Sequence, residues 1–250
     1  MLHGVTKFLG LGPIGAKMTD FWNLDEASGA TRMDSIVANA SDMLVNGTVG
    51  TAVGPKGGAD VAAAFTGITA NFLSAAVGGN AGQNLDIPAG GGNHCMFGWC
   101  YFTNNSVQQY FAYRGSNVSV ASTTTTHAMG ITATPAVFGQ NGGTSFTSGT
   151  QAAPAVSTWH FYVFWRDATD GKVRFQVDDG TIHVSVGPSN PTSQTATLFF
   201  GHGPAIPTFA RMSRWGWIKG NILTDPEKTA LYNGGPAGAL SWADIVAMQI

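Results

Sequence analysis

The sequence has few charged residues. Asp, Glu, Lys and Arg make up 10% of its 250 residues, and the net charge is −2; a soluble domain usually has about a quarter of such residues. Because a nucleic-acid groove needs clustered Lys and Arg, this composition argues against a nucleic-acid partner. The sequence also lacks an apolar run long enough to span a bilayer, so we expect no membrane partner.

Cysteine is scarce as well. Cys95 and Cys100 are the two cysteines of the chain, too few for a disulfide framework. They lie in one predicted strand at an odd separation, so their side chains should point to opposite faces and remain buried free thiols. No further Cys or His stands at a spacing suited to zinc, and we expect no zinc site.

The third scarce residue is glutamate, represented by Glu26 and Glu227. Retaining glycosidases need two carboxylates about 5–5.5 Å apart, and neither glutamate lies in a paired-carboxylate strand motif. The chain also lacks a G-x-S-x-G elbow and a phosphate-binding glycine loop. We therefore expect no catalytic residues and no enzyme activity, although a Ser-His-Asp site, which is defined by geometry, stays open.

What the sequence does contain is a succession of apolar or Thr-rich runs separated by Gly, Pro and Asn clusters, which predicts an all-β chain. Residues 158–166 alternate between two faces, and both faces carry large rings. This pattern predicts a central strand with its second face in a concave sheet. On that face we predict a ligand surface formed by His160, Tyr162 and Arg166.

Turn and capping residues predict a hairpin and two helices. Asp178-Asp179-Gly180 separates two strand-like runs, at 173–177 and 181–186, as in a β-hairpin. Short helices are expected at 225–233 and 241–248, since an N-capping residue precedes each of them, Thr224 and Ser241 respectively.

Four segments, taken in order, resemble the laminin-G-like domain of the concanavalin A-like lectin/glucanase superfamily. They are W-N-L-D-E-A-S-G from residue 22, A-A-F-T-G from residue 63, T-W-H-F from residue 158, and L-T-D-P-E-K-T-A-L-Y-N from residue 223. The resemblance implies a two-sheet antiparallel β-sandwich of the jelly-roll type with short C-terminal helices. We predict an N-terminal arm at 1–17, the sandwich at 18–235, and a C-terminal extension with a short helix at 236–250.

Some members of this family bind calcium at a loop rim through oxygen ligands. In this sequence Asp25, Asp34 and Asp42 could reach such a rim, but no D-x-D-x-D-G loop is present. We expect instead that Asp25 and Glu26 satisfy backbone amides or Arg32, and that the chain has no metal or other cofactor.

The resemblance breaks before the closing helix. The family usually has an acidic pair in this strand, whereas the chain has Ser213 and Arg214 within the run 209–217. A function that depends on the acidic pair is therefore not expected.

The N-terminal arm is apolar and is broken by glycines and Pro13, so it does not resemble a secretory signal. Its large apolar side chains gain little if they stay in water. We predict that they dock onto a partner, while packing on the chain's own sandwich remains the alternative. The predicted docking residues are Phe8, Leu9, Leu11 and Ile14.

These features together predict a non-catalytic surface-recognition or assembly module. Sandwiches that resemble this one usually work outside cells, and an export signal is not expected, which favours a tailed-phage virion protein such as a head decoration or tail-associated protein. Its expected partners are other virion proteins or further copies, with a glycan as a further candidate. The alternative is a glycan-binding or glycan-cleaving module of a bacterial extracellular protein.

Overall fold

The computed structural model of the chain describes residues 14–32, 34–36, 41–75, 85, 92–115, 125–132, 136–141, 144–152, 154–188, 197–203 and 206–247. Strands dominate these residues, and each strand pair is antiparallel. Most of the strands form two sheets, and short helices are few. The predicted all-β, two-sheet antiparallel fold with short C-terminal helices is confirmed.

The first sheet has eight strands, and the strand predicted to be central lies inside it. Along the sheet the order is β13 (His183–Val184), β12 (Val173–Val177), β11 (Trp159–Arg166), β6 (His94–Phe102), β17 (Phe209–Lys219), β4 (Val61–Thr66) and β3 (Gly50–Val53), and β1 (Asp20–Trp22) also pairs with β17. Asp178, Asp179 and Gly180 connect β12 to β13, which pair antiparallel, so the predicted hairpin is present.

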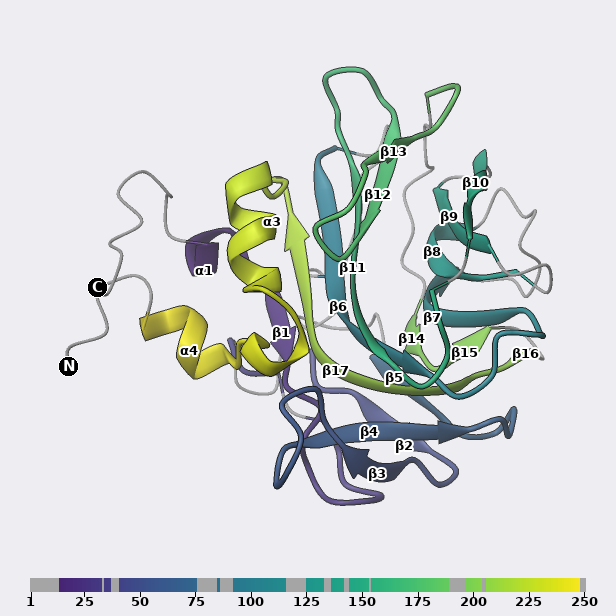
Figure 1. Cartoon of the computed structure of the whole chain (residues 1–250), viewed down its shortest axis with the longest axis vertical. Helices are drawn as coiled ribbons and strands as arrows, with labels where there is room; N and C mark the ends of the chain where they lie inside the picture. The colour runs from purple at the N-terminus through teal and green to yellow at the C-terminus, as the bar shows by residue number, and fades with distance from the viewer. Residues whose placement is uncertain are drawn as a thin grey trace.

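The second sheet has seven strands. Its order is β10 (Thr144–Ala152), β9 (Ala136–Asn141), β8 (Thr125–Ile131), β7 (Gln109–Gly115), β14 (Leu198–Phe200), β5 (Phe72–Ala75) and β2 (Leu44–Asn46). A small separate ladder pairs β15 (His202–Gly203) with β16 (Ile206–Pro207). In Figure 1, β7 to β10 lie to the right of β6 and β11, and the helices lie to the left.

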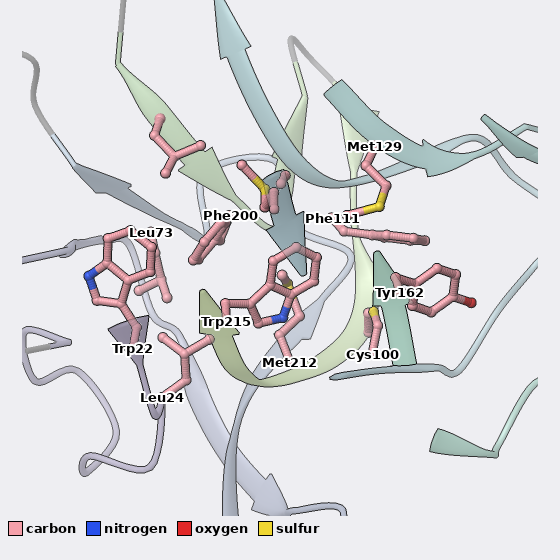
Figure 2. Close-up of a cluster of buried hydrophobic side chains, with 14 of the residues drawn as sticks. Trp22, Leu24, Leu73, Cys100, Phe111, Met129, Tyr162, Phe200, Met212 and Trp215 are labelled. Carbon is pink, nitrogen blue, oxygen red and sulfur yellow. The ribbon is translucent and has the colours of Figure 1, made fainter. Parts of the chain in front are cut away.

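Large apolar side chains from both sheets fill the space between them, and we call this group the inner cluster. Trp22 and Phe200 meet edge to face with ring centroids 5.4 Å apart, and Phe200 lies 5.1 Å from Trp215. Figure 2 shows Phe200, Trp215 and Phe111 filling this space. Fully buried rings of this size dominate the energetics of a core, since each removes a large apolar area from water.

A second apolar group, the outer cluster, lies on the opposite side of the eight-stranded sheet. It is covered by α1 (Ile14–Lys17), α3 (Asp225–Tyr232), the 3₁₀ turn η1 (Pro236–Gly238) and α4 (Trp242–Ala247). Tyr232 of α3 stacks on Trp99 at 5.9 Å, and the Lys228 ammonium lies 3.9 Å from the centre of the Trp165 ring. Ala239 and Ile245 belong to the outer cluster as well, so residues 236–247 pack on the sandwich in the same layer as α3.

The two C-terminal helices begin where the capping residues predict. The Glu227 carboxylate accepts hydrogen bonds from the Thr224 N–H at 2.8 Å and from its hydroxyl at 3.0 Å. Asp244 accepts from Ser241 in the same way, at 2.8 Å for both groups. These reciprocal contacts satisfy donors that would otherwise be orphaned at the start of each helix. None of the helices in the ranges given above is long and apolar enough to cross a bilayer.

The two cysteines occupy different clusters. Cys95 belongs to the outer cluster and Cys100 to the inner cluster, and both are buried free thiols. The odd separation on β6 produces this arrangement, because successive strand side chains point to opposite faces.

Candidate functional site

The predicted ligand face on β11 does not fit the structure. Tyr162 and Arg166 are 0% and 3% exposed, and Tyr162 belongs to the inner cluster, with its ring 5.0 Å from that of Phe111. Figure 2 shows the Tyr162 ring beside Phe111. Both faces of β11 are covered, one by the second sheet and the other by the helices, so neither forms an open concave surface.

His160, the third residue of that predicted face, forms a pair with Asp178. Its Nδ1 lies 2.8 Å from Oδ2 of Asp178, whose other oxygen accepts the Phe161 N–H at 2.9 Å. A carboxylate in this position directs the imidazole so that Nε2 carries the lone pair when the ring is neutral. However, His160 Nε2 and the Tyr162 hydroxyl are buried without hydrogen-bond partners in the structure. The His–Asp pair therefore has no serine hydroxyl bonded to it, as a Ser-His-Asp site would require.

The predicted docking residues separate into two groups. Ile14 lies in α1, is 3% exposed and belongs to the outer cluster, so it packs on its own chain and is not available to a partner. Phe8, Leu9 and Leu11 lie outside the described residues. At Ile14, therefore, the structure shows the alternative to docking, in which the arm packs on the chain's own sandwich.

Both glutamates take part in local structural contacts. Glu227 accepts a hydrogen bond from Lys17 Nζ at 2.7 Å in addition to its contacts with Thr224. The Glu26 carboxylate lies 3.6 Å from the Arg32 guanidinium, which also donates to the carbonyl oxygens of Glu26 and Ala27. The two glutamates occupy the helical layer and the loop after β1, so they do not form a carboxylate pair.

The aspartates considered for calcium also bind backbone groups. One oxygen of Asp34 accepts from the N–H groups of Phe21 and Ile36, each at 3.1 Å, and Asp42 accepts from the Asp34 N–H at 2.8 Å. Asp25 is exposed. No group of three or more His, Cys, Asp or Glu side chains suited to a metal ion occurs in the part of the chain that the structure describes.

The sequence did not single out Asp20, which is fully buried at the start of β1. Burial raises the pKa of this carboxyl from 3.8 to about 8, assisted by the neighbouring Asp34 carboxyl. A carboxyl that holds its proton near neutral pH is typical of functional acids. Since Asp20 is 0% exposed, a large substrate cannot contact it.

The outward side of the seven-stranded sheet presents a partly exposed group of side chains from three adjacent strands. We call it the aromatic face, and its members are Leu44, Asn46, Phe72, Ser74 and Phe199. Each alternates along its strand with a residue that belongs to the inner cluster or packs against it, such as Leu73 beside Phe72. The sheet therefore turns this row toward its outer surface.

Two rings form the centre of the aromatic face. Phe72 and Phe199 meet edge to face with centroids 5.6 Å apart, and Tyr113 continues the row at 6.2 Å from Phe199. Beside them the Asn46 side-chain amide donates to the Ser74 hydroxyl at 2.8 Å, and Leu44 is 55% exposed. The alternation of residues 72–75 and 198–200 could have indicated which side chains point outward. The pairing of these distant segments has no signal in the sequence.

No protein-family model matches the sequence, and no curated protein matches it in sequence. Solved structures match the chain in their three-dimensional fold. Domain 4 of AbnA, an extracellular GH43 arabinanase from Geobacillus stearothermophilus solved with arabinotriose, superposes with a TM-score of 0.62 at 13% identity, covering 86% of this chain and 98% of that chain.

Two further neighbours are larger proteins. The sialidase of Trypanosoma rangeli has a TM-score of 0.61 at 13% identity, and the match covers 89% of this chain and 33% of the sialidase. The binding domain of Paraclostridial Mosquitocidal Protein 1 has a TM-score of 0.65 at 8% identity, with coverages of 88% and 52%. The chain thus spans about a third to a half of these two proteins. At 8–13% identity these likenesses show a shared β-sandwich fold.

Proposed function

We propose that the chain is a non-catalytic recognition module that binds a glycan through the aromatic face. The observation that carries this proposal is the Phe72–Phe199 pair, which lies partly exposed on the outside of the seven-stranded sheet. Aromatic rings offer a broad apolar surface against which the apolar face of a sugar ring can pack. Asn46 and Ser74 beside them offer an amide and a hydroxyl that can hydrogen-bond to sugar hydroxyl groups.

The fold favours this surface over the outside of the other sheet. Helices α1, α3 and α4 and the turn η1 cover most of the outer side of the eight-stranded sheet. The arabinanase domain that shares this fold was solved with a bound arabinotriose. Recognition of a saccharide by a sandwich of this kind is therefore chemically reasonable, and the structural roles of Glu26 and Glu227 support binding without cleavage.

We place this module in the virion of a tailed phage, as a head decoration or tail-associated protein that contacts other virion proteins or further copies. The laminin-G-like sequence motifs and the low charge content support this placement. The alternative is a glycan-binding module of a bacterial extracellular protein. Antibodies against the chain should label purified phage particles in electron micrographs, whereas labelling of secreted bacterial protein alone would favour the alternative.

The binding proposal is tested on an array of neutral and acidic glycans. The chain should bind a defined subset, and Phe199→Leu, which keeps apolar volume but removes the ring, should weaken that binding. Val186→Ser is a suitable control, since Val186 is 99% exposed and lies next to β13, in the other sheet. Equal binding by the Phe199 variant would contradict the proposal. Release of shorter products from the bound glycan would show that the module is not purely a binding one.

A further inference from the structure

Three adjacent strands of the eight-stranded sheet place an arginine and two aromatic residues in one row on its outer side. Tyr101 of β6 is directly opposite Trp159 of β11 and, on the other side, opposite Arg211 of β17. The Arg211 guanidinium lies 4.4 Å from the centre of the Tyr101 ring, and the Tyr101 and Trp159 rings are 5.6 Å apart. We call these three residues the arginine row.

The charge of Arg211 has no protein counterion in the described part of the chain. The Arg211 side chain makes no ion pair or hydrogen bond there, and its contact is with the Tyr101 ring. Other basic residues of the same ranges are paired with carboxylates, namely Lys17, Arg32, Lys56, Arg174, Arg214 and Lys228. Arg211 differs from these six residues in that its side chain rests on an aromatic ring and has no acid partner in the described ranges.

The arginine row lies at the border of the helical layer. Trp99, two residues before Tyr101 on β6, is covered by Tyr232 of α3. In the other direction, Thr66 and Thr103 are exposed at the ends of β4 and β6. On the far side of Arg211 the row continues with Ala64 and Gly50, which are partly exposed and too small to cover the guanidinium. A ligand can therefore approach Arg211 between the helices and the two threonines.

The chemistry of this row suits an anion with a single charge, such as a carboxylate. A guanidinium offers two parallel N–H donors that match the two oxygens of a carboxylate. Contact with the Tyr101 ring holds the group in place, so less side-chain entropy is lost when a ligand binds. A single cation cannot neutralise a polyanion such as a nucleic acid, which needs several.

We propose that the arginine row binds a saccharide that carries a single carboxylate, such as a terminal uronic or sialic acid residue. The carboxylate pairs with Arg211, and the exposed hydroxyls of Thr66 and Thr103 contact the neutral remainder of the sugar. Trp159 is buried beside Tyr101 and supports that ring from within the outer cluster. This site is on the opposite sheet from the aromatic face, so the two sites are independent.

The test uses a trisaccharide with one terminal glucuronate, its carboxyl-reduced form, and a short peptide with one glutamate. Binding of the wild type is followed by NMR through the Nε–Hε signal of Arg211. Because substitutions at Arg211 remove that signal, the affinities of the wild type and of every variant are measured by isothermal titration calorimetry. The acidic trisaccharide should shift this signal saturably, and Arg211→Gln should weaken binding by about tenfold or more, as loss of a charge-assisted bidentate contact predicts. Arg211→Lys should bind more weakly than the wild type but better than Arg211→Gln.

Lys172→Gln is the matched control, because it removes one positive charge from a turn outside the row. It should leave binding unchanged, and thermal melts should show that all variants remain folded. Equal binding of the carboxyl-reduced trisaccharide, unchanged binding by Arg211→Gln, or tighter binding of the glutamyl peptide would each overturn the proposal. Phe199→Leu should not affect this site, so failure here is distinguishable from failure of the aromatic face.

Discussion

The indole ring of Trp215 lies directly against the backbone of Gly98 on the neighbouring strand. A Cβ atom at position 98 would be 2.4 Å from the Cδ2 atom of that ring. Trp215 is fully buried, and its Nε1–H donates to the Trp99 carbonyl oxygen at 3.2 Å. Glycine at this position is therefore required by the close approach of a ring that cannot easily move.

Gly98→Ala should lower the free energy of unfolding by about 3 kcal/mol, since overpacking a rigid core forces rings and backbone apart. Chemical denaturation followed by tryptophan fluorescence measures the change. Gly187→Ala provides the control: a Cβ there meets no atom within 4 Å, and the change should stay within about 0.5 kcal/mol. Similar effects of the two substitutions would contradict this account of the core.

Arg214 replaces part of the acidic pair that the resemblance led us to expect, and it binds an acid elsewhere. Its guanidinium donates to both oxygens of Asp60 at 2.6 and 3.1 Å, and the two side chains are 8% and 14% exposed. Arg214→Ala should destabilise the fold by about 3 kcal/mol because it leaves the Asp60 carboxylate poorly solvated and unpaired. Lys56→Ala, which breaks an exposed pair with Asp244, should cost below about 1 kcal/mol.

The same pair predicts sensitivity to acid. Burial alone would raise the pKa of Asp60, but hydrogen bonds from Arg214 and from the Lys56 N–H lower it below 3.8. A carboxyl with a lowered folded-state pKa stabilises the protein above its unfolded pKa, and this stability is lost as pH falls through the folded value. Wild-type protein should therefore lose more stability than Asp60→Asn below about pH 4. Parallel pH profiles for the two proteins would contradict the assignment.

The buried Asp20 should make the stability of the fold depend on pH in the opposite direction. Burial raises the pKa of its carboxyl to about 8 in the folded chain, whereas the unfolded chain releases this proton near pH 4. The folded state then binds the extra proton between these values, so stability falls as pH rises from about 4 to about 8. Asp20→Asn cannot ionise, and its stability relative to wild type should increase over that interval. Urea unfolding at pH 5, 7 and 9 measures this difference, and a constant difference would refute the prediction.

Local patterns in the sequence predicted most of the fold. The turn at residues 178–180, the capping residues Thr224 and Ser241, and the alternation along β11 depend on neighbours in the sequence, and the structure agrees with each of them. The resemblance to a family predicted that the strands form two antiparallel sheets packed face to face. Alternation alone does not determine this arrangement.

The candidate sites could not be predicted in the same way. Alternation showed that β11 has two apolar faces, but it could not show that helices cover one and the second sheet covers the other, which buries Tyr162 and Arg166. The arginine row depends on the register of β6, β11 and β17, segments that are distant in the sequence. Only that register makes neighbours of Arg211 and Tyr101.

The placement of the two cysteines on opposite faces of β6 gives each layer of the protein its own chemical reporter. Burial raises the pKa of Cys95 to about 12 and that of Cys100 well above its usual value, so neither thiol should react with a thiol reagent until its surroundings open. Labelling of Cys95 would follow detachment of the helices, and labelling of Cys100 would follow separation of the sheets. If the two layers open in separate steps, the two thiols will be labelled at different rates under native conditions.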